Sequence, residues 1–167
     1  MSRPFVQLLS TNGDGTGTTN AIGDYSSAAE TFELADQTDA LETVVVRLIV
    51  YVEDSGAFDA AGYGNAGVLA NGITVSVLSA AGAEIIDLTP DPIKSNGGWA
   101  SLAYDTQVAT WGTGNEFLVT RWTFGKFTPD GGIVLTDGER LVVNVNDDLT
   151  DLVAHRFTAQ GYTSHSY

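Results

Sequence analysis

The stretch that decides the fold is ETVVVRLIVYVE, residues 42–53. It predicts the longest strand of a chain whose hydrophobic pattern has period 2 almost throughout. Because successive side chains point to opposite faces of a strand, one face is expected to hold Val44, Val46, Leu48, Val50 and Val52. The other face is expected to hold Val45, Arg47, Ile49 and Tyr51. A strand that is apolar on both faces is usually covered on both. We therefore expect one face in the core, and the other against a loop or a neighbouring subunit.

Short segments with the same periodicity flank this strand on both sides. Further strands are expected at residues 5–10, 30–35, 72–79, 84–88, 99–104, 107–111, 116–124, 133–135, 140–146 and 152–162. Turns rich in Gly and Pro separate them, and no segment has an apolar stripe at helical spacing. The pattern predicts an all-β fold, an antiparallel, jelly-roll-like β-sandwich with long Gly-rich loops. We expect residues 1–167 to form a single domain, in which residues 1–20 could be an extended N-terminal arm.

The charge of the chain restricts its partners. Seven Lys and Arg face 21 Asp and Glu, which gives a formal net charge of −14. The basic residues are scattered, so binding to nucleic acid or to an anionic membrane is not expected. A basic protein surface, a cation or neutral groups remain as partners, unless the charge only maintains solubility. The chain has no Cys, which excludes disulfides and thiolate chemistry. It shows neither a signal peptide nor a membrane-spanning stretch, so synthesis in a cytosol is expected.

Two polar segments have the residue types of a calcium site. In residues 12–17, Asn12, Asp14 and Thr16 alternate as in an EF-hand loop, but Gly23 stands where the bidentate Glu is needed. A plain Gly-rich turn is the better interpretation. Asp147, Asp148 and Asp151 follow a strand and could bind Ca²⁺ if their loop folds inward. The alternative is an Asp-capped turn. We expect no metal and no cofactor.

Residue patterns for catalysis are weak, and we expect the protein not to be an enzyme. The two histidines, His155 and His165, are not accompanied by a Gly-x-Ser-x-Gly motif. Among 21 acidic residues the sequence singles out no facing pair for glycoside hydrolysis. His155 is expected to be hydrogen-bonded near a sheet edge, on the same face as Val153 and Phe157. Several aromatic residues could form a glycan platform or a subunit contact, although Trp122 and Phe124 share core spacing with Leu118.

Several segments of the sequence resemble virion proteins of tailed phages. They are LIVYVEDSGAFDAAGYG (48–64), GITVSV (72–77), DLT (87–89), PIK (92–94) and DGERLVVNVNDDLTDLVAHRFTAQGY (137–162). The resemblance implies a capsid decoration or cement protein, a β-sandwich that is often trimeric and binds the outer face of an icosahedral shell. Its partner would be the major capsid protein or another virion protein, and its location the capsid outer surface after synthesis in the host cytoplasm. The resemblance implies no catalytic residue.

A decoration protein needs docking surfaces, and the chain offers several. The long loop 54–71 carries apolar side chains that a loop facing only solvent does not need, so it should cover a sheet face or reach a partner. The expected interface residues are Arg3, Phe5, Arg47, Ile49, Tyr51, Phe58, Tyr63, Val68 and Leu69. The negative charge would complement a basic patch on the shell and steer docking. The alternative functions are a carbohydrate-binding module on a tail or fibre and, less favoured, a glycoside-active enzyme.

Overall fold

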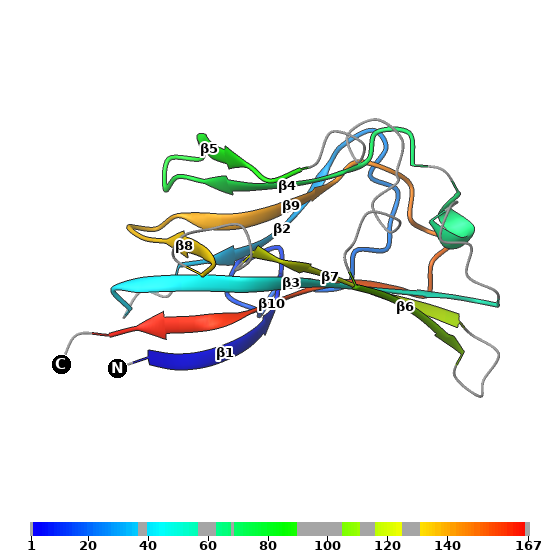
Figure 1. Ribbon diagram of the computed structural model, residues 1–167. Helices are drawn as coiled ribbons and strands as arrows, with labels where there is room; N and C mark the ends of the chain where they lie inside the picture. Colours follow the sequence, from blue (N-terminus) through cyan, green and yellow to red (C-terminus); the bar gives the residue numbers. More distant parts are fainter. Residues whose placement is uncertain are drawn as a thin grey trace.

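The computed structural model describes residues 2–36, 40–56, 63–67, 69–89, 105–110, 116–124 and 131–165. Within these ranges the chain forms ten β-strands and one short 3-10 helix, η1 (Gly64–Ala66). The strands make two antiparallel sheets that pack face to face (Figure 1). This confirms the predicted all-β sandwich. None of the helical structure in the described ranges is long and apolar enough to cross a membrane.

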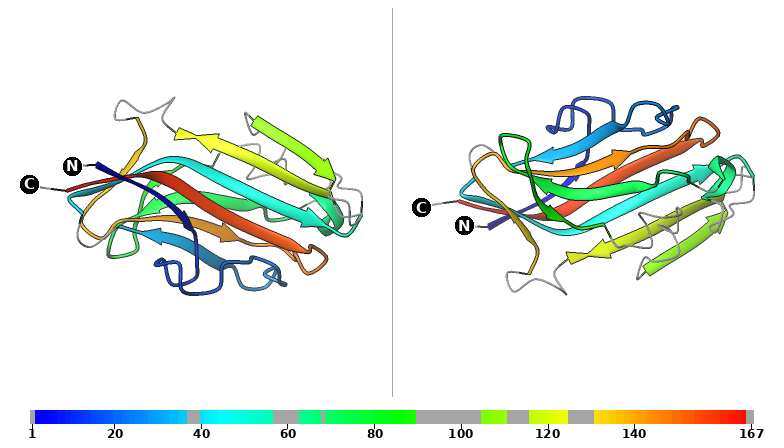
Figure 2. Two further views of the ribbon diagram at one scale, coloured as in Figure 1. Left: turned by 90° about the horizontal axis from the view of Figure 1, so that it is seen from below. Right: turned by 90° about the horizontal axis from the view of Figure 1, so that it is seen from above.

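The first sheet has six strands and the second has four. The first runs in the order β1 (Ser2–Leu8), β10 (Ala154–Ser164), β3 (Glu42–Asp54), β7 (Glu116–Thr123) and β6 (Asp105–Thr110), and β8 (Ile133–Leu135) pairs with the start of β3. The second runs in the order β2 (Glu30–Ala35), β9 (Arg140–Val145), β4 (Ile73–Leu78) and β5 (Glu84–Asp87). The first and last strands of the chain pair with each other, so the two termini lie side by side (Figure 2).

Strand β3 is the centre of the first sheet. It pairs with β10 along one edge, and with β7 and β8 along the other. Its second half follows the predicted alternation, because Leu48, Val50 and Val52 are buried in the core. Its first half does not. The register places Arg47 opposite Gln160 but Val45 opposite Gly161, which leaves Val46 as the extra residue of a β-bulge. A bulge reverses the alternation beyond it.

The bulge corrects the predicted faces of β3. Val45 belongs to the core cluster, although its odd number had placed it on the opposite face. Val46, predicted to share the core face with Val50, is only half-buried. Strict alternation fails here because the extra residue shifts the pleat by one position.

The core lies between the two sheets and follows the predicted pattern elsewhere. The largest side chains buried in it are Tyr63, Phe32, Phe157, Leu9, Leu34, Leu48, Leu69, Ile73, Leu118, Leu135, Leu141 and Leu149. Phe32 of the second sheet and Phe157 of the first meet with ring centroids 6.0 Å apart. Trp122 packs against this core and beside Phe124, as the predicted core spacing indicates. Val153, predicted to point inward, is 40% exposed because it precedes the first residue of β10.

Most strand boundaries lie close to the predicted ones, and the two terminal strands differ most. The first strand covers residues 2–8 and not 5–10, because β10 continues to Ser164, which pairs with Ser2. The first part of segment 1–20 therefore lies along the edge of the first sheet. The last strand begins at Ala154 and not at residue 152, because Leu152 still belongs to the preceding turn. The expected strand at residues 99–104 lies outside the described residues.

The bulge makes one glycine indispensable. A β-carbon at Gly161 would overlap the backbone carbonyl of Val44 on the adjacent strand. We expect Gly161→Ala to lower the free energy of unfolding by roughly 3 kcal/mol, the upper range for overpacking, in urea denaturation. Gly131→Ala is the control. Its β-carbon would meet no atom within 4 Å, and its φ of 76° should cost only about 1 kcal/mol. Equal losses would contradict a steric role for Gly161.

Candidate functional site

Three segments that are far apart in the sequence converge beside the second sheet. They are residues 21–29 ahead of β2, residues 69–72 ahead of β4, and residues 146–153 between β9 and β10. Backbone hydrogen bonds join the first segment to the third: Leu149 N–H donates to Gly23 O at 2.8 Å, and Tyr25 N–H donates to Asp147 O at 3.1 Å. Where the three segments meet, the side chains of Asn71, Asn146 and Asp147 lie close together.

The Asp147 carboxylate connects the third segment to the second. It is buried, with only 6% of the residue exposed. Its Oδ1 accepts hydrogen bonds from the backbone N–H of Ala70 at 2.8 Å and of Asn71 at 3.1 Å. Its Oδ2 accepts from Asn71 at 3.1 Å and from Gly72 at 2.6 Å. Successive N–H groups that point at one anion stabilise it strongly. Asp147 therefore fixes the end of the long loop where β4 begins. We call this arrangement the Asp147 clasp.

The other two residues of the predicted acidic cluster do not join Asp147. Oδ1 of Asp148 accepts hydrogen bonds from the backbone N–H of Thr150 at 3.0 Å and from its hydroxyl at 2.7 Å, which closes a local turn. Asp151 is exposed. Within the described ranges, no three His, Cys, Asp or Glu side chains are grouped to hold a metal ion. The local turn at Asp148 matches the turn alternative for this segment.

The Gly-rich segment at residues 12–17 is also a turn. Oδ1 of Asp14 accepts hydrogen bonds from the N–H of Thr16 at 2.9 Å and from its hydroxyl at 2.6 Å. These two bonds lower the pKa of Asp14 because they stabilise its charged form. Gly23, at the position of the missing EF-hand ligand, instead lies against the ring of Tyr25, where a β-carbon would clash.

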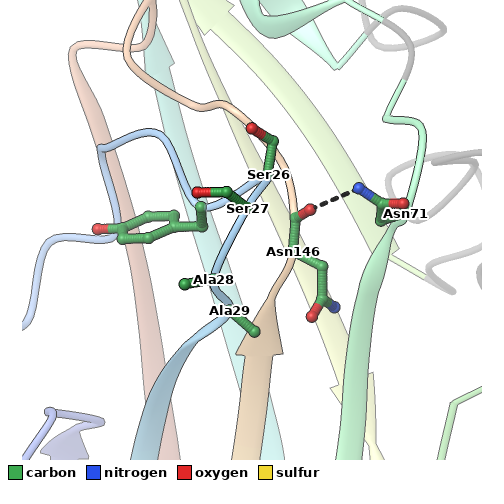
Figure 3. Close-up of a pocket in the computed structure, with 7 residues that line it drawn as sticks. Ser26, Ser27, Ala28, Ala29, Asn71 and Asn146 are labelled. Carbon is green, nitrogen blue, oxygen red and sulfur yellow. Dashed lines mark hydrogen bonds between the residues drawn. The ribbon is translucent and has the colours of Figure 1, made fainter.

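An open hollow of about 430 Å³ lies between the three segments. Its lining residues are Tyr25, Ser26, Ser27, Ala28, Ala29, Asn71 and Asn146 (Figure 3). Nδ2 of Asn71 donates to the backbone carbonyl of Asn146 at 2.8 Å, across the mouth of the convergence. Nδ2 of Asn146 donates to Gly72 O at 3.1 Å. Sequence reasoning missed this site, because its residues come from three separate turns and form no motif.

The side chain of His155 points into the interior from the start of β10. The pairing of β10 with β1 begins only at Thr158, so beside His155 the sheet has its edge. There the loop residues Asn20 and Ala21 bond to the His155 backbone. The side chain is fully buried, and Nε2 lies 2.7 Å from the hydroxyl of Tyr63, which is also fully buried. The imidazole also contacts the ring of Phe157, with centroids 4.6 Å apart. Nδ1 makes no hydrogen bond within the described part of the chain. This histidine is a core residue, because it is closed off from solvent.

The position of Tyr63 corrects part of the predicted interface. Tyr63 (φ 57°) and Leu69 from the long loop are 0% and 1% exposed, so both side chains fill the protein's own core. Neither side chain has surface left for a partner, because the loop folds inward. There Tyr63 bonds to His155, and residues 70–72 bond to Asp147. Two further predicted interface residues, Phe58 and Val68, lie outside the described residues.

Three of the predicted interface residues lie together on the solvent side of the first sheet. This outer face consists of Arg47, Ile49 and Tyr51 on β3, Arg156, Thr158 and Gln160 on β10, Phe117, Val119 and Arg121 on β7, and Val6 and Leu8 on β1. The ring of Tyr51 stacks on Phe117, with centroids 5.6 Å apart and an interplanar angle of 30°. Burial, and then the hydrogen bond to Glu53, raise the pKa of Tyr51 to about 12, so its hydroxyl is neutral at physiological pH. The outer face combines apolar, aromatic and Arg side chains.

Strand β1 borders this outer face, and its second edge pairs with no strand in the described ranges. Val6 is 69% exposed, Arg3 is exposed, and Phe5 packs partly against the core. Leu9 N–H donates to Phe157 O, so odd-numbered residues of this segment hydrogen-bond to β10 and even-numbered ones face the edge. Pro4 is therefore at an edge position, where it presents no N–H. A Pro at this position protects an edge against pairing with another strand.

The Asp147 clasp generates a stability prediction. In Asp147→Asn, the side-chain NH₂ group would face backbone N–H groups that now donate hydrogen bonds to the carboxylate. We expect the free energy of unfolding to fall by about 3 kcal/mol, because hydrogen bonds to a buried charge are lost. Urea denaturation measures this loss. Asp148→Asn is the matched control and should change stability by less than about 0.5 kcal/mol, since its exposed side chain keeps Oδ1 for Thr150. Similar values for both variants would contradict the clasp.

Burial of His155 generates a pH prediction. Burial lowers the pKa of this imidazole to about 3, while the backbone of Ala21 acts in the opposite direction. Between the ordinary value of about 6.5 and the folded value, the unfolded chain binds more protons. The stability contributed by neutral His155 is therefore complete above pH 6.5 and declines as the pH falls toward 3, by up to about 1.4 kcal/mol per pH unit.

The variant His155→Gln isolates this effect. Gln keeps a hydrogen-bonding group for Tyr63 but does not titrate, so stability should decline less steeply between pH 6.5 and 4.5 than in the unmodified chain. His165→Gln, which replaces the other histidine, should retain the full slope. Urea denaturation at several pH values measures the slopes. If the three proteins share one slope, His155 does not control the acid sensitivity.

Comparisons with known proteins identify neither a family nor a structural neighbour. No protein-family model, no curated protein and no solved structure matches the chain. Two features of the described residues bear on function. These are the outer face of the first sheet and the hollow beside the Asp147 clasp.

Proposed function

We propose that this chain is a virion structural protein, a capsid decoration or cement protein that binds the outer face of an icosahedral shell and stabilises it without catalysis. The observation that carries the proposal is the composition of the outer face of the first sheet. The resemblance of residues 48–64 and 137–162 to phage virion proteins supports it. The proposed location is the capsid outer surface, and the proposed partner is the major capsid protein or another virion protein.

The outer face has the residue types that dominate protein interfaces. Aromatic residues and Arg are enriched at such interfaces, where they contribute most of the binding energy. Ile49 lies between Thr158 and Arg121 in the register, and Tyr51 lies between Arg156 and Val119. The apolar side chains among them are half-buried, so each retains surface that a partner could remove from water. Such burial stabilises a complex by roughly 25 cal/mol per Å².

Charge favours a specific kind of partner surface. Three of the seven basic residues of the chain, Arg47, Arg121 and Arg156, lie on the outer face. A guanidinium binds a carboxylate through two parallel hydrogen bonds. The matching shell surface should therefore be apolar with acidic groups at its margin. The chain as a whole carries a net charge of −14, which can steer the approach toward basic parts of the shell. Association of copies as a trimer on the shell is part of the same proposal.

The roles of two buried ionisable groups, Asp147 and His155, favour a structural function over an enzymatic one. The Asp147 carboxylate is occupied by backbone N–H groups of its own chain, and Nε2 of His155 is occupied by Tyr63. Both groups stabilise the long loop between β3 and β4. An acid or base for catalysis has to reach its substrate, and these two groups are enclosed.

Cosedimentation tests the proposal. Shells assembled from the major capsid protein of the same genome should bind the chain at a saturating, constant ratio to shell subunits. Ile49→Asp removes apolar contact area from the outer face and places a carboxylate opposite Arg121, which then competes with the partner for this guanidinium. It should weaken binding at least about tenfold, equal to about 1.4 kcal/mol. Arg156→Glu should act in the same direction, and its exposed side chain makes misfolding a poor explanation.

The matched control is Ile85→Asp on β5, where the side chain is 50% exposed and belongs to the second sheet. This variant should bind shells as the unmodified chain does. Circular dichroism verifies that each variant is folded, and light scattering reports the number of copies in the free state. Absence of cosedimentation would contradict the proposed function. Unchanged binding of Ile49→Asp and Arg156→Glu would contradict the outer face as the docking surface.

A further inference from the structure

The hollow beside the Asp147 clasp has the size and chemistry of a ligand site that shell binding does not use. Its volume of about 430 Å³ lies within the range of small-molecule sites. Its lining contains amide, hydroxyl and methyl groups and no ionisable carboxylate, ammonium or guanidinium. It is separate from the outer face, since its residues come from the turns at the ends of β2, β4 and β9 in the second sheet.

Several polar atoms of the lining have no hydrogen-bond partner among the residues that the structure describes. Nδ2 of Asn71 and Nδ2 of Asn146 bond to backbone carbonyls, which fixes the orientation of both amides. Within the described part of the chain, no group donates to their Oδ1 atoms, and the hydroxyls of Ser27 and Tyr25 make no hydrogen bond. Burial, and then the charge of Glu30, raise the pKa of Tyr25, so its hydroxyl remains a donor at neutral pH. The hollow thus offers two carbonyl acceptors and the hydroxyl of Ser27, while the hydroxyl end of the Tyr25 ring lies against Gly23.

The site is held in place before any ligand arrives. The Asp147 clasp fixes the backbone of Asn71, and Asn146 directly precedes Asp147 in the chain. The Asp147 carbonyl accepts a hydrogen bond from Tyr25 N–H, which fixes the remaining wall. One residue therefore braces all three segments. Such preorganisation reduces the entropy that a ligand has to overcome on binding.

The lining selects among ligand classes. An anion would find no basic side chain and a chain of net charge −14. A metal ion would find no carboxylate in the lining, and an apolar ligand would leave the amide oxygens unpaired. A neutral polyhydroxylated ring satisfies the lining, because its hydroxyls donate to the amide oxygens and accept from the Ser27 hydroxyl. We propose that the hollow lined by Tyr25, Ser27, Asn71 and Asn146 binds a neutral pyranose sugar.

An NMR titration of the ¹⁵N-labelled full chain tests this site directly. The probes are the methyl glycosides of glucose, galactose, mannose and N-acetylglucosamine, each added up to tens of millimolar. At least one should shift the backbone amide signals of residues 26–29, 71 and 146, with a Kd on the order of 1 mM, as a few hydrogen bonds allow. Glycerol at the same concentration controls for non-specific contact with a polyol.

Three variants assign the binding to the hollow. Ala28→Trp fills it without removing a hydrogen bond of the lining, and should abolish the shifts. Asn71→Ala removes one carbonyl acceptor together with the Nδ2 bond to the Asn146 carbonyl, and should weaken binding at least about tenfold. Asn12→Ala changes an exposed Asn in a different turn, and should leave the Kd unchanged.

The outcomes separate this proposal from the proposed function. Absence of shifts with all four glycosides would overturn the sugar site, and so would shifts that persist in Ala28→Trp or that glycerol reproduces. None of these results bears on shell binding, because that test uses the outer face. Conversely, a chain that fails to bind shells but gives sugar-dependent shifts lost in Ala28→Trp would support the sugar site alone.

Discussion

The structure depends on the pairing of β3 along both of its edges. Strand β10 lies on one side, and β7 with β8 on the other, so the backbone polar groups of this apolar strand are satisfied within the sheet. With both edges of β3 paired, only the side chains on its two faces can contact other parts of the protein or a partner. One face meets the second sheet through Leu48, Val50 and Val52. The other holds Arg47, Ile49 and Tyr51 toward solvent, and the proposed docking surface is built around them.

Two buried polar groups complete the fold by fixing the long loop between β3 and β4. Burying a carboxylate or an imidazole is unfavourable unless it is hydrogen-bonded. The Asp147 carboxylate meets this condition through the N–H groups of Ala70, Asn71 and Gly72. His155 meets it at Nε2 through the Tyr63 hydroxyl. Each group therefore stabilises one loop conformation over others, which apolar packing alone specifies less strictly.

The two candidate surfaces differ in chemistry because they differ in origin. The outer face is a regular sheet surface, where side chains from neighbouring strands stand side by side and provide continuous contact area. The hollow lies where three turns meet, and turns present amides, hydroxyls and backbone carbonyls. A large partner fits the first arrangement, and a small polyhydroxylated ligand fits the second. A shell-bound protein could use both at once, since they belong to different sheets.

The sequence by itself determined the all-β class, the position of most strands and the core residues of Glu30–Ala35, Ile73–Leu78 and Arg140–Val145. Period-2 alternation is a local property, so the sequence of each strand is enough to predict which of its side chains face inward. The outward placement of Ile49 and Tyr51 was predictable for the same reason.

Only the tertiary structure decided the bulge at Val46, the burial of Tyr63, the role of Asp147 and the existence of the hollow. Each depends on contacts between distant segments. Asp147 reaches residues 75 to 77 positions earlier in the chain, and His155 reaches Tyr63 across 92 positions. A run of acidic residues looks the same in the sequence whether it binds a metal, closes a turn or receives backbone N–H groups. The physical reason is that folding chooses the partners of a polar side chain through the packing of the whole chain, and not through its neighbours in sequence.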